Sequence, residues 1–453
     1  MGLGFRGIRL RPWPRAATFL VIGLLIREAF SFWTGHPYDF EVWIRTGYVV
    51  AHGTNPYIAF WPAAPGVSID SFTGTLPSAA YLPFWPLVTG GSYQLYLAVG
   101  GGDRFVYYFF LKQVPIFADV ATAFLLYRLV QNWTGDYTLA TRALAFWCLF
   151  PYAIVITAVW GQFDSVEVLC LLAILLVAGT PRRNLAYGIG ILVKWVTVIY
   201  LPFEFFRERG LRRLWILLGL AVPAALTVVV FLALRWPFTG IEATTTSEAG
   251  GGGGAMNYAR LFELAPIYNA AVRVPGLLTL LPYLFVPVVF AVGWVMAKRV
   301  RTAGGPRAEL TCLLAIMGAF LLTRWGLNEQ YFLYLFAPMA LDIYVFHPGR
   351  RDLYTYIGTL ASAFLIVNNT FGIWFLTPLN VGYDTWAINF NRHALSSPIR
   401  EYTLDGLAIL ITLSLVQLVW ALLQDQPHPR PWLLRILPGW TPSRPPSPEP
   451  PGA

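Results

Sequence analysis

A small set of polar residues in four short segments has the types and spacing needed for chemistry. The set comprises Asp39, Glu41, Gln162, Asp164, Lys194, Arg324, Asn328, Glu329, Gln330 and Tyr331. Carboxylates suit general-base activation of a hydroxyl group. Cations suit a phosphate leaving group, because they stabilise the charge that develops on it. Together these side chains suit transfer of a group from a phosphate-bearing donor to a hydroxyl acceptor.

Each of these groups also has a purely structural explanation. The acidic pair that follows the first apolar run could begin an ordinary acidic loop. Asp164 could stabilise a helix N-terminus, and Arg324 could pair with Glu329 across a tight turn. Lys194 could extend its ammonium to the membrane interface. However, an ionisable residue within a membrane segment is a functional candidate by default, so we interpret the set as one candidate site.

The composition of the chain places these residues in a membrane protein. Of the 453 residues, 57% are hydrophobic and 12% are charged, and the mean hydropathy is +0.57. Soluble domains carry about a quarter charged residues, so this chain has too little polar surface to cover itself in water. The net charge of +9 does not indicate nucleic-acid binding, because the basic residues lie between the apolar runs, where they indicate topology.

The sequence predicts neither a disulfide framework nor a metal site. Cys148, Cys170 and Cys312 each lie inside an apolar run, which favours buried, reduced thiols. The five histidines show no metal-ligand spacing. Asp39 and Glu41 could hold a divalent cation, but no third ligand is evident, so we expect chemistry without a metal or another cofactor.

Apolar runs close to the length of a spanning helix recur along the chain, which predicts an all-α polytopic membrane protein. Between the first two runs, residues 35–105 form a long extracytoplasmic loop whose apolar part is broken by proline and glycine. We expect short interfacial helices there. About ten spans are predicted, at residues 16–34, 107–130, 140–158, 163–179, 214–234, 277–296, 310–324, 331–346, 353–373 and 404–423.

The basic residues fix the sidedness of the loops through the positive-inside rule. The clusters at 182–183 and 207–213 lie on one side only if the apolar segment 184–206 does not cross the membrane. We therefore predict a hairpin of two short half-helices with Lys194 near its turn, surrounded by protein or a watery cavity. Both termini are then cytoplasmic, and the candidate site lies on the extracytoplasmic side of what we expect to be the plasma membrane.

The chain divides into three predicted regions. Residues 1–206 form a catalytic membrane module that includes the long first loop. Residues 207–424 supply further membrane helices, with a mobile glycine-rich extracytoplasmic loop at 235–276. Residues 425–453 form a proline-rich cytoplasmic tail.

The order of several short motifs resembles that of the GT-C superfamily of polytopic glycosyltransferases. Within it, the chain is most similar to the mannosyltransferases that add the first mannose to the glycosylphosphatidylinositol precursor, and to their prokaryotic relatives. The similarity covers roughly residues 20–345. It rests on these segments: Asp39-Phe40-Glu41, Gly53 to Tyr57, Phe117 to Leu129, Phe150-Pro151, Trp160 to Asp164, Tyr187-Gly188 with Lys194 and Pro202, and Gln330 to Leu333 with Pro338.

The resemblance implies a GT-C-like fold and inverting transfer of a hexose, with mannose as the leading candidate. The donor would be a dolichyl- or polyprenyl-phosphate sugar, and the acceptor a glycolipid or glycan outside the cytoplasm. We assign Asp39 as general base, with Glu41 holding the acceptor or sharing that role, and Lys194 and Arg324 as ligands of the donor phosphate. The sugar and acceptor hydroxyls are assigned to Gln162, Asp164, Asn328, Glu329, Gln330 and Tyr331.

Transport is the alternative function. A lipid-linked glycan flippase or a secondary transporter would use intramembrane charges and broken helices to build a path across the bilayer. A catalytically inactive partner of another transferase is a third explanation. The chain shows no internal repeat, and its charges gather near one membrane face, so we favour the transferase.

Overall fold

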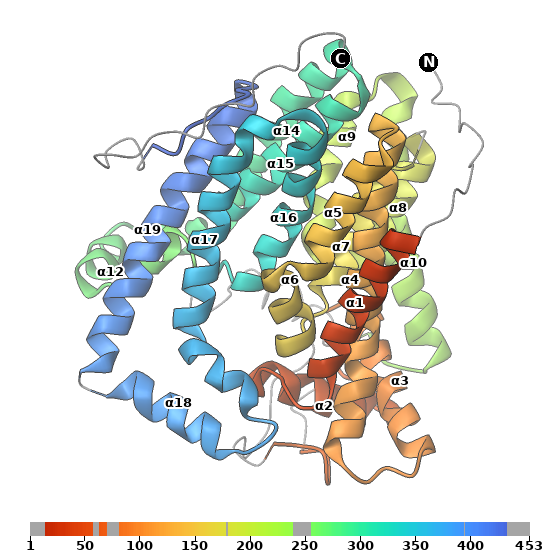
Figure 1. Cartoon of the computed structure of the whole chain (residues 1–453), viewed down its shortest axis with the longest axis vertical. Coiled ribbons are helices and arrows are strands. Elements are labelled where there is room, and N and C mark those ends of the chain that lie inside the picture. Colours follow the sequence, from red (N-terminus) through yellow and green to blue (C-terminus); the bar gives the residue numbers. More distant parts are fainter. Residues whose placement is uncertain are drawn as a thin grey trace.

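The computed structural model describes residues 14–57, 63–69, 81–177, 180–238, 255–393 and 395–432, and in these residues all regular structure is helical. Figure 1 shows a bundle of roughly parallel helices with shorter helices lying across one end. Several helices have outward apolar faces: on α10 (Ile216–Ala233), Leu217, Val229 and Leu232 are each more than half exposed. Such faces are stable in lipid and unfavourable in water, so the chain is an all-α membrane protein.

In the described ranges, five helical segments are long and apolar enough to span a membrane, or up to seven if two bent pairs each count as one span. The five are α4 (Arg104–Thr134), η3–α10 (Gly210–Ala233), α13–α14 (Leu277–Ala303), α15 (Gly305–Thr323) and α19 (Ser396–Leu423). The bent pairs are α5 (Tyr137–Leu149) with α6–η1 (Pro151–Trp160), and η8–α17 (Pro348–Asn368) with η9 (Thr370–Leu376).

The other predicted spans are also helical, although they are shorter. They correspond to α1 (Pro14–Ser31), α7 (Asp164–Ile174) and α16 with the π-helical turn η7 (Leu333–Phe346). Length and composition alone do not assign these segments to the membrane, so the count of ten spans remains a prediction.

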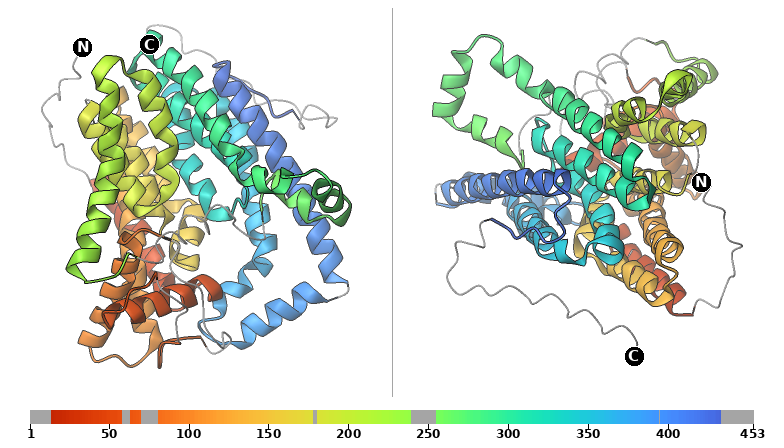
Figure 2. Two further views of the ribbon diagram at one scale, coloured as in Figure 1. Left: turned by 180° about the vertical axis from the view of Figure 1, so that it is seen from behind. Right: turned by 90° about the horizontal axis from the view of Figure 1, so that it is seen from above.

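The predicted hairpin is present. The helix α8 (Thr180–Val193) is followed by Lys194, whose backbone is extended, and then by η2 (Trp195–Tyr200) and α9 (Leu201–Arg207). The chain reverses at this point, because Glu204 of α9 contacts two residues of α8: its carboxylate lies 3.5 Å from the Arg183 guanidinium and accepts a hydrogen bond from the Tyr187 hydroxyl at 3.1 Å. Figure 2 shows this hairpin beside α10.

The long first loop carries two helices, α2 (Pro37–Ala51) and α3 (Phe84–Ala98), which pack on each other and cross one end of the bundle in Figure 1. Their contact is aromatic, with the rings of Trp43 and Trp85 edge to face at 5.4 Å. Figure 1 shows α18 (Gly382–Arg392), from the C-terminal part of the sequence, at the same end of the bundle.

The remaining C-terminal elements pack along the bundle. The short helices η4 (Tyr258–Glu263) and α12 (Ala265–Val272) contact each other, and Figure 2 shows α12 projecting from the side of the bundle. Residues 239–254 of the predicted glycine-rich loop, which include its run of glycines, and most of the proline-rich tail lie outside the described residues.

One turn brings the first loop against the bundle. The π-helical turn η1 (Val155–Trp160) ends at Gly161, which has a left-handed backbone with φ of 88°. A Cβ atom built on Gly161 would lie 2.4 Å from the ring of Phe40 in α2. This turn therefore requires glycine both for its backbone conformation and for the close approach of α2.

We expect Gly161→Ala to destabilise the protein more than Gly135→Ala, which serves as its control. Gly135 also has a left-handed backbone, but a Cβ atom there would meet nothing within 4 Å. The backbone cost alone is about 1–2 kcal/mol, and overpacking against Phe40 adds roughly 1–3 kcal/mol. Denaturant unfolding of both variants in detergent measures the difference; equal losses would contradict the proposed close packing at Gly161.

Candidate functional site

Asp39 lies in the first turn of α2, where a carboxylate interacts favourably with the helix dipole. Its Oδ2 atom accepts hydrogen bonds from Trp160 Nε1 at 2.7 Å and from Gln162 Nε2 at 2.6 Å. The side chain is nonetheless 26% exposed. Two donors therefore fix the direction of the carboxylate while part of it remains accessible, which is the arrangement that a general base requires.

Glu41 points elsewhere, although it lies only two residues from Asp39. Its carboxylate is fully buried and accepts hydrogen bonds from Arg45 Nε at 2.6 Å and from the backbone N–H of Ile69 at 2.7 Å. These contacts tie residues 63–69 to α2. The geometry therefore favours a structural role for Glu41 over a share in the proton transfer.

A buried ion pair joins the hairpin turn to α7. The Lys194 ammonium lies 2.9 Å from Asp164 Oδ1, and the Tyr334 hydroxyl donates to the same oxygen. Asp164 is fully buried and Lys194 is 3% exposed. The acid thus compensates a cation that would otherwise be costly to bury.

The turn Gln162–Phe163–Asp164 connects this ion pair with Asp39. Gln162 donates to Asp39, while Asp164, two residues later, accepts from Lys194. The intervening Phe163 ring lies 5.2 Å from the Lys194 ammonium. The turn is the junction between η1 and α7, so the end of one helix and the start of the next position both halves of the site.

Arg324 and Lys194 converge on one aromatic ring. Arg324, which follows the last residue of α15, donates to the Tyr331 hydroxyl at 3.0 Å, and its Cζ atom lies 4.6 Å from the centre of that ring. The Lys194 ammonium lies 4.8 Å from the same ring centre. Lysine and arginine side chains thus approach the same ring, and both are residue types that bind phosphate groups.

Glu329 binds two asparagine side chains, whereas the structural explanation from the sequence would pair it with Arg324. Glu329 begins the short helix η6 (Glu329–Phe332), and its Oε1 accepts from Asn368 Nδ2 at 2.6 Å and from Asn369 Nδ2 at 3.3 Å. Of its neighbours in the candidate set, Asn328 is half-buried, whereas Gln330 is buried.

Burial raises the pKa of Glu329 to about 7, and the nearby charge of Asp39 contributes to this rise. The amide groups of Asn368 and Asn369 act in the opposite direction, because hydrogen bonds from these donors stabilise the carboxylate. The interaction with Asp39 also links the two parts of the site electrostatically.

Several site residues lie outside the set selected from the sequence. Trp160, which orients Asp39, belongs to the segment Trp160 to Asp164 but is not among the predicted site residues. Tyr334 lies one turn beyond the selected Tyr331. Asn368 ends the apolar helix α17 (Arg351–Asn368) and Asn369 is its C-cap, and their contact with Glu329 is not indicated by the local sequence.

Within the described parts of the chain, no group of three or more His, Cys, Asp or Glu side chains is placed to hold a metal ion. The residues that the structure brings together are carboxylates bound by N–H donors and cations bound by acids and rings. The expectation of chemistry without a metal remains a prediction.

We expect Lys194→Met to destabilise the protein by about 3–5 kcal/mol, because the variant leaves the Asp164 carboxylate buried without its cation. The double variant Lys194→Met/Asp164→Leu should recover much of this loss. Lys298→Met, at an exposed lysine on α14 whose ammonium lies over the Trp294 ring, is the control and should change the free energy of unfolding by less than about 1 kcal/mol. A double variant as unstable as the sum of the two single variants would contradict this coupling.

The raised pKa of Glu329 predicts that stability falls as the pH rises from about 4.5 to about 7. In this range the folded state holds a proton that the unfolded state has released, so raising the pH favours unfolding. The contribution is on the order of 3 kcal/mol across the range. Unfolding measured against pH should therefore show a shallower decline for Glu329→Gln, and an unchanged slope would argue against a buried acid of this kind.

Comparison with known proteins adds no family assignment to this geometry. The chain matches no family model and no curated protein. The contacts made by Asp39, Lys194 and Arg324 are therefore the basis on which its function is inferred.

Proposed function

We propose that this chain is an integral-membrane glycosyltransferase of the GT-C kind. It would move a hexose, with mannose as the leading candidate, from a polyprenyl-phosphate carrier to a hydroxyl of a glycolipid or glycan. The reaction would take place on the extracytoplasmic side, with the lipid bilayer holding the donor.

The observation that carries this proposal is the turn Gln162–Phe163–Asp164. Residues two apart in this turn hold a partly exposed carboxylate, Asp39, and a buried ammonium, Lys194. The residue proposed as the base and the cation proposed to stabilise the leaving phosphate are therefore held by the same turn. Holding reacting groups in a fixed arrangement lowers the entropic cost of a transfer reaction, which supports the proposal.

In the proposed step, Asp39 removes the proton from the acceptor hydroxyl as that oxygen attacks the anomeric carbon. The bond between this carbon and the phosphate oxygen breaks, and the electron pair leaves with the polyprenyl phosphate. Attack opposite the leaving group inverts the anomeric configuration. Lys194 and Arg324, which share the Tyr331 ring, stabilise the charge gained by the phosphate.

The remaining polar groups have supporting roles in the proposal. Gln162 and Trp160 hold Asp39 in one orientation. Glu329 and Gln330, both buried, and the half-buried Asn328 would bind sugar hydroxyls. Glu41 is bonded to Arg45 and to the backbone of Ile69, so the proposal gives the general-base role to Asp39.

Sugar transfer in isolated membranes tests the proposal. Radiolabelled polyprenyl-phosphate mannose and native lipid extract would be supplied to wild type, Asp39→Asn and Asp103→Asn at equal expression. We expect label to enter a glycolipid or glycan with wild type and to fall at least 100-fold with Asp39→Asn, because a general base contributes about 10²–10⁴-fold. Asp103 is an exposed residue that caps α4, and asparagine also caps helices well, so its variant should retain activity.

The other outcomes are equally informative. Transfer that survives Asp39→Asn would keep the transferase but remove Asp39 as the base. No transfer from mannose or glucose carriers would contradict the proposal and favour the transport alternative, which lipid translocation in vesicles would then test directly.

A further inference from the structure

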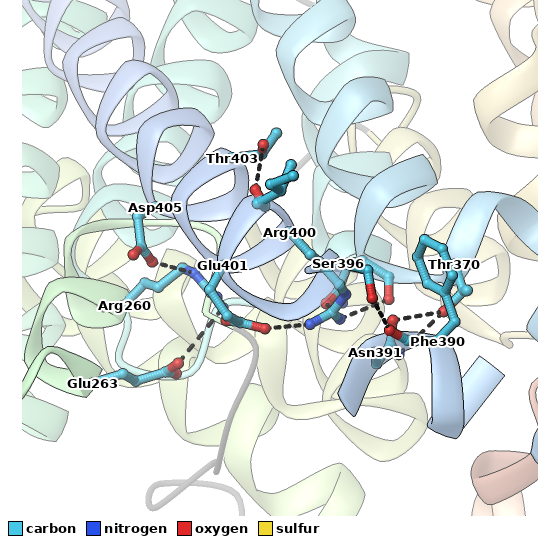
Figure 3. A network of polar contacts seen from close by, with 12 residues as sticks. Arg260, Glu263, Thr370, Phe390, Asn391, Ser396, Arg400, Glu401, Thr403 and Asp405 are labelled. Atoms are coloured by element: carbon cyan, nitrogen blue, oxygen red, sulfur yellow. Dashed lines mark hydrogen bonds and ion pairs between the residues drawn. The ribbon is translucent and has the colours of Figure 1, made fainter. Parts of the chain in front are cut away.

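A polar network connects the C-terminal helix α19 with η4 beside the bundle (Figure 3). At its centre, Arg260 is 3% exposed and contacts three carboxylates, those of Glu263, Glu401 and Asp405. Glu401 also contacts Arg400, its neighbour on α19. The two arginines are thus held in place by acids from two elements.

Arg400 extends this network to the candidate site through Asn368. Its Nη2 atom donates to both the backbone oxygen and the side-chain Oδ1 atom of Asn368, each at 3.0 Å. The side-chain nitrogen of Asn368 then donates to Glu329 Oε1 at 2.6 Å. A continuous chain of hydrogen bonds therefore runs from α19 to Glu329.

These hydrogen bonds fix which way the Asn368 amide faces. A guanidinium has only donors, so it must meet the amide oxygen. The amide nitrogen is consequently left to face Glu329, where it stabilises a carboxylate. If the amide turned over, its oxygen would oppose the carboxylate oxygen and its nitrogen would oppose the guanidinium, and both contacts would be repulsive.

We propose that Arg400 is a positioning residue that orients Asn368 and thereby holds Glu329 as an acceptor for substrate hydroxyls. This inference rests on the proposed function for its consequence in catalysis. The orientation itself depends only on the hydrogen bonds of Arg400, Asn368 and Glu329.

The other groups that face Glu329 are not replaced in the variants described below. Asp39 of α2 interacts with it electrostatically, Asn369 donates to its carboxylate, and the Tyr152 hydroxyl of α6 donates to its backbone oxygen at 2.7 Å. A change in Glu329 after substitution of Arg400 would therefore report on Asn368 or on the lost positive charge.

Infrared titration of the purified full chain separates these two explanations. The carboxylic-acid band that disappears in Glu329→Gln identifies Glu329, and its midpoint would be compared in wild type, Arg400→Gln, Arg400→Lys and Asn368→Ala. We expect Arg400→Gln to move the midpoint to higher pH, because the amide can then turn its oxygen toward the carboxylate. Arg400→Lys, which keeps a cationic donor, should remain close to wild type.

The double variant Arg400→Gln/Asn368→Ala decides whether Arg400 acts through Asn368. If it does, the double variant matches Asn368→Ala, since the effects of residues in one path are not additive. A further shift in the double variant, or an unchanged midpoint in Arg400→Gln, would overturn the inference. Arg392→Gln, at an exposed arginine on α18, is the control and should leave the midpoint unchanged.

Transfer assays provide the second readout. We expect Arg400→Gln to lower kcat/KM about tenfold, mainly through KM, as for a weakened hydrogen bond to a charged group. A loss confined to kcat would contradict positioning for hydroxyl binding. Absence of transfer in wild type would reject the proposed function, and the infrared comparison would still decide the role of Arg400.

Discussion

A single ammonium group holds together the two helix ends on which the candidate site depends. Lys112 of α4 donates to the backbone oxygens of Thr34 and Ala158 at 2.6 and 2.7 Å, and to the Thr34 hydroxyl at 3.0 Å. Backbone oxygens near helix C-termini lack helical partners and carry partial negative charge, so a cation suits this position. Two residues beyond these oxygens lie His36, which caps α2, and Trp160, which orients Asp39. The hydrogen bonds of Lys112 therefore help to set the distance between Asp39 and its donors Trp160 and Gln162.

The buried ion pair of Arg27 and Asp119 differs from the arrangement of cations in the candidate site. Arg27 and Asp119 are fully buried and bonded at 2.7 Å, and the acid also accepts from Trp147, which satisfies both charges. At the site, Lys194 and Arg324 instead approach one ring, with Asp164 bonded to only one of them. The approach of these two cations to the Tyr331 ring is the feature on which the proposed phosphate ligand rests.

The sequence predicted those features that are local or that act through charge. Arginines on both sides of segment 184–206 predicted the reversal at Lys194. The resemblance in motif order selected both Asp39 and Gln162, which the structure shows in contact. Arg45 follows Glu41 by four residues on one helix, a spacing that favours the ion pair that the structure shows, while a share of Glu41 in proton transfer stays a prediction. The amides that bind Glu329 could not be placed from sequence, because their contact depends on how α17 packs against η6. Long-range packing of this kind has no local signature.

The C-terminal helices complete the site even though the motifs stop before them. The backbone N–H of Gly35 donates to the Phe375 oxygen at 2.9 Å, and the ring of Trp374 lies 5.2 Å from His36. The turn η9 thus packs against the start of α2, close to Asp39, while the preceding helix α17 supplies the donors to Glu329. The predicted boundary between regions at residue 206 would place Asp39 in a different region from Arg324 and Glu329. The candidate site is therefore an assembly of helix ends from both halves of the chain, and its geometry depends on the packing of the whole bundle.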